Sequence, residues 1–95
     1  MQKQYVRAFA LYDRAITLTQ STLGPTHSSL AQHCLNAGIA HLANGDSPTA
    51  RKFLTRALVI AKKTGLREDG QLYVRIVQQL REASKLRYAD KHLDN

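Results

Sequence analysis

The sequence has few of the residues that interrupt helices or crosslink chains. It contains one cysteine, two prolines, five glycines and no tryptophan among 95 residues. The single cysteine, Cys34, excludes an internal disulfide and fits a reducing, cytoplasmic compartment. No run of about 18 apolar residues predicts a transmembrane helix, and Arg7 and Asp13 break the apolar pattern that a secretory signal needs. With no long polar loop either, these absences indicate an all-α fold.

Acidic residues are also scarce. Seven Asp and Glu stand against fourteen Lys and Arg, which gives a formal net charge of +7. Residues 1–45 carry a net +2 and residues 46–95 a net +5. Long-range attraction therefore favours acidic partners, whether peptide, nucleic acid or anionic surface. The length allows one domain with a modest core.

Two stretches of the chain resemble each other at a constant offset of 42 residues: 8–18 (AFALYDRAITL) and 50–60 (ARKFLTRALVI). In each stretch a small, a large and a small residue recur at i, i+4 and i+7, which is one face of an α-helix. The shared offset indicates a repeated supersecondary unit. The matching pairs are Ala8/Ala50, Tyr12/Leu54, Arg14/Arg56, Ala15/Ala57, Ile16/Leu58 and Leu18/Ile60.

Turn-forming residues divide the chain into about four helices. The predicted ranges are 4–22, 29–43, 47–63 and a last helix from 68 or 71 to 90. A glycine follows each of the first three helices, at positions 24, 45 and 65. A serine is expected to cap the second helix, and Asp46 or Ser47 the third, with a proline in its first turn. Beyond residue 85 the apolar periodicity fades, so the end is expected to fray.

Glycine at position 38 lies in the middle of the second predicted helix. Such a glycine costs about 1 kcal/mol relative to alanine. It usually permits close approach of another backbone. We therefore expect neighbouring helices to nearly touch at Gly38, Ala50 and Ala57.

The helix pair over residues 29–63 resembles a tetratricopeptide repeat. Cys34, Gly38, Ala50, Leu54 and Ala57 stand at that family's characteristic small and large positions, with Gly45-Asp46 at the turn. The connector Leu23-Gly24-Pro25-Thr26-His27 and the 42-residue spacing are similar to the kinesin-light-chain type. Two departures are His41, where the family usually has an aromatic residue, and Lys62, where it usually has proline.

The resemblance implies an α-solenoid fragment of antiparallel helix-turn-helix repeats forming a single domain over residues 1–95. Residues 4–22 would be the second helix of one repeat, 29–63 a complete repeat, and 68–90 a capping or partial-repeat helix. About three repeats are needed for stability. We therefore expect either a longer parent array or self-association as a homodimer or by helix swapping.

The resemblance also implies a concave groove that binds a partner peptide. Carried over to this sequence, its lining is Gln32, Leu35, Asn36 and Ile39. Asn36 offers both a hydrogen-bond donor and an acceptor to an extended peptide. The plainer alternative is an exposed polar residue without a ligand. The family's carboxylate clamp is disfavoured, because Val74 and Gln78 occupy its cationic positions.

The last helix carries a possible anion-binding stripe of Arg75, Arg81 and Lys85. The alternative is an ordinary solvated face with interleaved acids. No aromatic ladder or glycine-rich phosphate loop supports nucleic acid, which is the disfavoured partner. An acidic protein or peptide partner is favoured, and no membrane partner is expected.

Candidates for catalysis are weak. No HExxH, CxxC or GxSxG motif is present, and the histidines are scattered. A metal site through His27 and His33 stays open beside the commoner surface histidine, and Cys34 is interpreted as a small buried hydrophobe. We therefore expect a non-enzymatic protein-interaction module without a cofactor or metal. The alternatives are nucleic-acid or acidic-surface binding and a helical accessory region of a larger enzyme or signalling protein.

Overall fold

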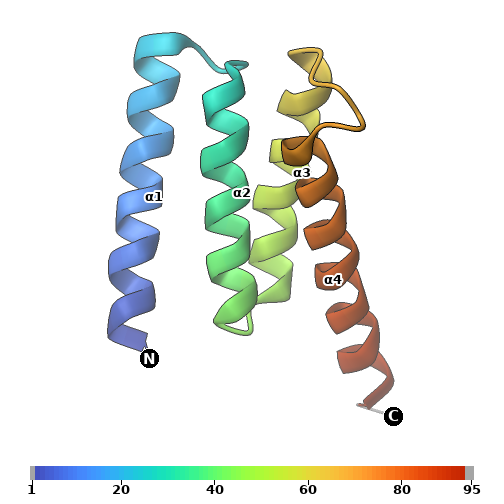
Figure 1. Cartoon of the computed structure of the whole chain (residues 1–95). Helices are drawn as coiled ribbons and strands as arrows, with labels where there is room; N and C mark the ends of the chain where they lie inside the picture. The colour runs from blue at the N-terminus through green and yellow to red at the C-terminus, as the bar shows by residue number, and fades with distance from the viewer. Residues whose placement is uncertain (1, 94–95) are drawn as a thin grey trace.

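Four α-helices form the fold in the computed structural model, which describes the backbone of residues 2–93 and the side chains of residues 5–85. They are α1 (Gln2–Leu23), α2 (Ser28–Ala43), α3 (Ser47–Lys63) and α4 (Gln71–Leu93). Each runs antiparallel to the one before it (Figure 1). The described part of the chain contains no strand, which confirms the all-α prediction. None of its helices is long and apolar enough to cross a membrane.

Helix α2 ends where the sequence predicts, at a glycine with a left-handed backbone. Gly45 has a φ of 81°, and its N–H donates to the Leu42 carbonyl at 3.0 Å. The N–H of Asp46 donates to the His41 carbonyl at 2.9 Å. This pair of bonds satisfies carbonyls that the helix end would otherwise leave free. Helix α3 ends in the same way at Gly65.

The helix starts agree with the sequence for α3 and differ for α2. Asp46 caps α3, because its Oδ1 accepts from the Thr49 N–H at 3.2 Å, and Pro48 lies in the first turn. The expectation that a serine caps α2 is wrong. His27 is the cap, and its Nδ1 accepts from the Ser29 N–H at 3.1 Å. A neutral imidazole nitrogen can replace a hydroxyl oxygen because both are hydrogen-bond acceptors.

Helix α4 begins at Gln71, one of the two predicted starts, and continues to Leu93, three residues beyond the predicted end. The predicted end at residue 90 is therefore three residues short, although the apolar periodicity fades past Lys85. No glycine or proline interrupts residues 86–93, and most of them are adequate helix formers. The side chain of Leu86 and residues 94–95, on which other expectations fall, lie outside the described part.

The contact between α2 and α3 is the most extensive between any two described helices, and Gly38 lies within it. A Cβ atom added to Gly38 would lie 2.5 Å from the Leu54 Cγ and 3.3 Å from the Ala50 carbonyl oxygen. Leu54, Ala50 and Ala57 are all fully buried. Only a residue without a side chain fits there, so the predicted close approach at Gly38 is confirmed.

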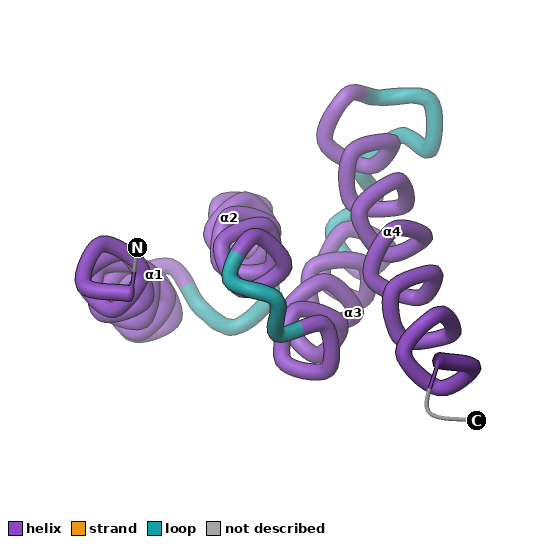
Figure 2. Tube along the Cα trace, turned by 90° about the horizontal axis from the view of Figure 1, so that it is seen from below, coloured by secondary structure: helices purple, strands orange, loops and turns teal. Residues whose placement is uncertain are grey.

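The helices follow one another in a bent row, with α1 against α2, α2 against α3, and α4 against α3 and the edge of α2 (Figure 2). Helices α1 and α4 therefore lie at the two ends of the row. The molecule measures 45 × 32 × 17 Å. Its core is shared by all four helices and consists of Ile16, Leu30, Ala31, Cys34, Leu35, Ala37, Ala50, Leu54, Ala57, Ile60, Ala61, Ile76 and Ala83.

Candidate peptide-binding site

Three of the predicted groove residues share one side of α2. Gln32, Asn36 and Ile39 follow each other at i, i+4 and i+7, and each is half-buried. The Gln32 Nε2 donates to the Asn36 Oδ1 at 3.0 Å. This bond fixes the two amides relative to each other on the helix surface.

The amide pair leaves two hydrogen-bonding groups free. Among the described residues, the Asn36 Nδ2 donates to no protein acceptor and the Gln32 Oε1 accepts from no protein donor. An extended peptide presents one N–H and one carbonyl per residue. The remaining donor and acceptor on α2 therefore match the two backbone groups of a bound strand.

Leu35 does not belong to this surface, and its predicted place in the groove is wrong. Its side chain is fully buried, with an exposed fraction of 0%. One residue along a helix is a rotation of about 100°. That rotation takes Leu35 from the side of Asn36 into the core, so it supports the surface from beneath and cannot contact a ligand.

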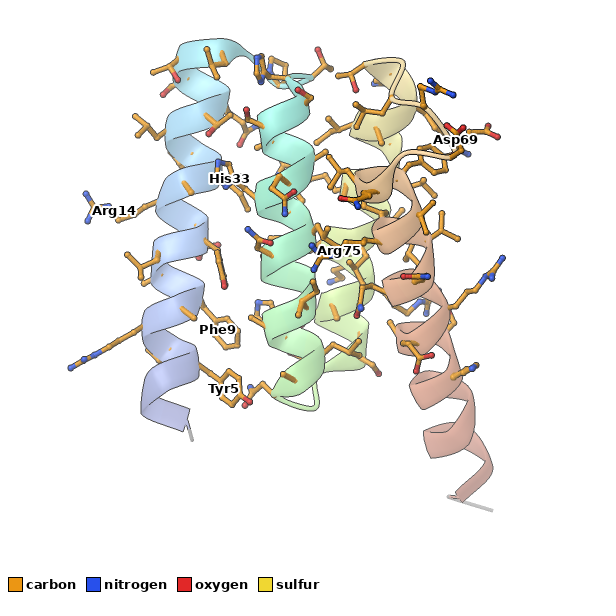
Figure 3. The ribbon with its side chains drawn as sticks, in the orientation of Figure 1. Tyr5, Phe9, Arg14, His33, Asp69 and Arg75 are labelled. Carbon is orange, nitrogen blue, oxygen red and sulfur yellow. The ribbon has the colours of Figure 1, made fainter. Side chains whose placement is uncertain are left out.

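The cationic residues of α4 are divided between two sides of the helix. Arg75 is exposed and extends from α4 toward α2 (Figure 3). Arg81 and Lys85 instead border a separate hollow beside α3, and Lys85 lies 3.6 Å from the Glu82 carboxylate. The three bases therefore do not form one stripe. Arg75 is the only one of the three that extends toward α2.

The histidines and the cysteine have structural surroundings. The Nδ1 of His27 is engaged in the cap of α2, and His33 lies between α1 and α2 (Figure 3). Within the described residues no group of three or more His, Cys, Asp or Glu could hold a metal ion. Cys34 is fully buried. Burial raises the pKa of the Cys34 thiol, and the charge of Arg56 opposes this only in part.

A stack of three rings joins the first three helices, and the sequence did not predict it. His41 lies between Phe9 and Phe53, with ring centroids 3.9 and 5.3 Å away and interplanar angles of 6° and 9°. The sequence did contain a sign of the stack, because His41 occupies a position where the family usually has an aromatic residue. An imidazole is itself a flat ring, so the stacking role is kept while the residue type changes.

The comparison with protein families agrees with this geometry. The family model of the tetratricopeptide repeat matches residues 1–63, which is about two thirds of the chain. The chain belongs to the tetratricopeptide repeat family. Such repeats generally mediate protein–protein interaction and are typically non-catalytic scaffolds. No match was found among curated proteins or among solved structures.

Proposed function

We propose that this protein is a non-enzymatic interaction module that holds an extended segment of a partner protein along the exposed side of α2. The observation that carries the proposal is the amide pair of Gln32 and Asn36, which leaves the Asn36 amide nitrogen and the Gln32 amide oxygen without a partner among the described residues. Ile39, one turn further along, offers apolar surface to a partner side chain. Arg75 extends from α4 toward this side and favours a carboxylate on the partner.

The proposal can be tested with a peptide selected from a displayed random library on the unmodified protein. Replacing Asn36 by alanine removes a donor to the peptide backbone and releases the Gln32 amide. A net hydrogen bond contributes about 0.5–1.5 kcal/mol. We therefore expect Asn36→Ala to lower the affinity for the selected peptide by about threefold to tenfold in calorimetric titration.

Gln20→Ala is the matched control, because Gln20 is an exposed amide on α1, a different helix from the one that carries Gln32 and Asn36. It should leave the affinity within about twofold, while both variants keep the helicity of the parent. Unchanged affinity in Asn36→Ala would remove Asn36 from the site. An equal loss in Gln20→Ala would show that the peptide binds elsewhere.

A further inference from the structure

The internal repeat identifies a second surface, on the side of α4 that faces away from α2. Helix α4 packs against α3 as α2 packs against α1, at the same offset of 42 residues. Helix α2 has another face, which α3 covers. The corresponding face of α4 contains Val77 and Leu80, the counterparts of Leu35 and Gly38. Leu35 and Gly38 are buried, whereas Val77 and Leu80 are only partly covered.

This face of α4 forms a hollow with the neighbouring edge of α3. The hollow has a volume of about 640 Å³. Its apolar floor comes from Leu58, Val77 and Leu80, and its border from Arg81, Ser84 and Lys85. Arg81 and Lys85 are both exposed. An apolar strip with cations along one side complements an amphipathic helix with acids along its border.

A helix that docks in the hollow must have a small residue where it faces Leu80. In the α2–α3 contact the bare Gly38 receives the side chain of Leu54. On α4 the counterpart of Gly38 is Leu80, which already occupies that space. A helix docked here must therefore present glycine, alanine or serine to Leu80, which inverts the small and large partners of the α2–α3 contact.

A second copy of this chain fits this surface poorly. The helix of a copy that corresponds to α3 is α1, and its counterpart of Leu54 is Tyr12. Tyr12 against Leu80 would place two large side chains where the repeat accommodates one. Helix α1 also brings Arg7 and Arg14, against the single acid Asp13, to a border that is already positive.

We propose that the hollow bordered by Arg81 and Lys85 docks an acidic amphipathic helix of a partner protein, with a small residue set against Leu80. This surface is separate from the exposed side of α2. The two sites can therefore be occupied by different segments. The acidic side chains along the border of the partner helix are attracted to Arg81 and Lys85 and orient the helix. The apolar floor of the hollow supplies most of the buried area.

The probe is a fluorescein-labelled designed peptide of about 18 residues, long enough for several helical turns. It carries leucines at helical spacing, one central alanine on the apolar face and glutamates along its borders. Two control peptides replace the central alanine by leucine or the glutamates by lysines. In fluorescence anisotropy with the full chain, we expect saturable binding of the first peptide. The leucine peptide should bind about tenfold more weakly, as overpacking predicts, and the lysine peptide should not bind.

Two protein variants with the same change in net charge locate the site. Arg81→Glu with Lys85→Glu reverses the border, while Arg7→Glu with Arg14→Glu reverses two exposed bases of α1, outside the hollow. The first variant should lower the affinity for the acidic peptide by about tenfold, as the loss of two local charge pairs predicts. The second variant should lower it by less than about threefold. Equal losses, or no binding of the acidic peptide, would overturn the proposal. So would a sedimentation experiment in which the border variant abolishes self-association, because a second copy would then occupy the hollow.

Discussion

His41 stabilises the fold through its ring and destabilises it through one of its nitrogens. Its ring stacks between Phe9 and Phe53, yet its Nδ1 is buried without a hydrogen-bond partner among the described residues. Stacking stabilises the contact of three helices. The unpaired nitrogen lowers stability, because it has lost its water without gaining a partner.

Replacing His41 by phenylalanine should keep the stack and remove the unpaired nitrogen. An unsatisfied buried polar atom costs about 1–3 kcal/mol. Allowing for imperfect fit of the larger ring, we expect His41→Phe to raise the free energy of unfolding by about 1 kcal/mol in urea titration. His41→Ala, which removes the ring as well, should lower it. A loss of stability in His41→Phe would show that the imidazole makes a contact other than stacking.

Asp46 shows how a single carboxylate links the end of one helix to the start of the next. Its Oδ1 accepts from the Thr49 N–H, and its own N–H donates to the His41 carbonyl. Hydrogen bonds from Thr49 lower the pKa of Asp46 below its ordinary value of 3.8. The charged form of Asp46 therefore stabilises the folded state more than the protonated form does.

The Asp46 cap should be measurable in its size and in its pH dependence. Asp46→Ala should lower the free energy of unfolding by about 1 kcal/mol at pH 7, as for other helix caps. Since the folded pKa is depressed, the charged cap contributes fully above pH 3.8 and its contribution falls as the pH drops through the folded value. The difference between parent and variant should shrink below about pH 4. A difference that is constant from pH 7 to pH 3 would contradict the cap.

At the scale of the helix, the residue pattern predicts that the helices exist and in what order they follow. It predicts less well which face of a helix is free to bind a partner. The offset of 42 and the glycines predicted four helices and the close contact at Gly38. The cap at His27 was missed, because cap preferences are statistical and any nearby acceptor can serve. Leu35 was misplaced for a different reason: the family pattern names positions, whereas the burial of Leu35 depends on how the neighbouring helices pack against α2.

The binding surfaces were only partly predictable. The side of α2 with Gln32 and Asn36 follows from the helical repeat of 3.6 residues, but the bond between their amides needed coordinates. The separation of Arg75 from Arg81 and Lys85 follows from rotation around α4. The hollow could not be derived from α4 alone, because Leu58 of α3 contributes to its floor.

At the scale of the whole molecule, α1 carries large apolar side chains that the described residues leave mostly exposed. Leu11 and Leu18 are both 64% exposed. Ile60, the counterpart of Leu18 in α3, is 3% exposed, and α3 lies between two neighbouring helices whereas α1 contacts α2 alone among the described helices. Exposed leucines at this spacing form the kind of patch that marks a protein-interaction site.

We expect the 95-residue chain to self-associate through α1, as the repeat arrangement suggested. Leu11→Glu with Leu18→Glu should shift the sedimentation coefficient to that of a monomer without loss of helicity, because both side chains are outside the core. A parent chain that sediments as a monomer at every concentration would contradict self-association. An assembly that survives the double substitution, such as a helix-swapped dimer, would contradict the role of α1.

The contact of α2 and α3 at Gly38 determines the spacing of the helices and so the position of both proposed surfaces. A Cβ at this position would meet the Leu54 Cγ at 2.5 Å. Gly38→Ala gains about 1 kcal/mol of helix propensity but loses about 1–3 kcal/mol by overpacking. Leu54→Ala alone should lose about 2–5 kcal/mol through the cavity it leaves.

The most direct test of this contact is a double-mutant cycle of Gly38→Ala and Leu54→Ala, measured by urea unfolding. If the side chain of Leu54 fills the space above Gly38, the methyl group of the new alanine enters the cavity in the double variant. The two losses should then fall short of additivity by about 1 kcal/mol or more. Losses that add within about 0.3 kcal/mol, or a Gly38→Ala variant more stable than the parent, would contradict the close contact.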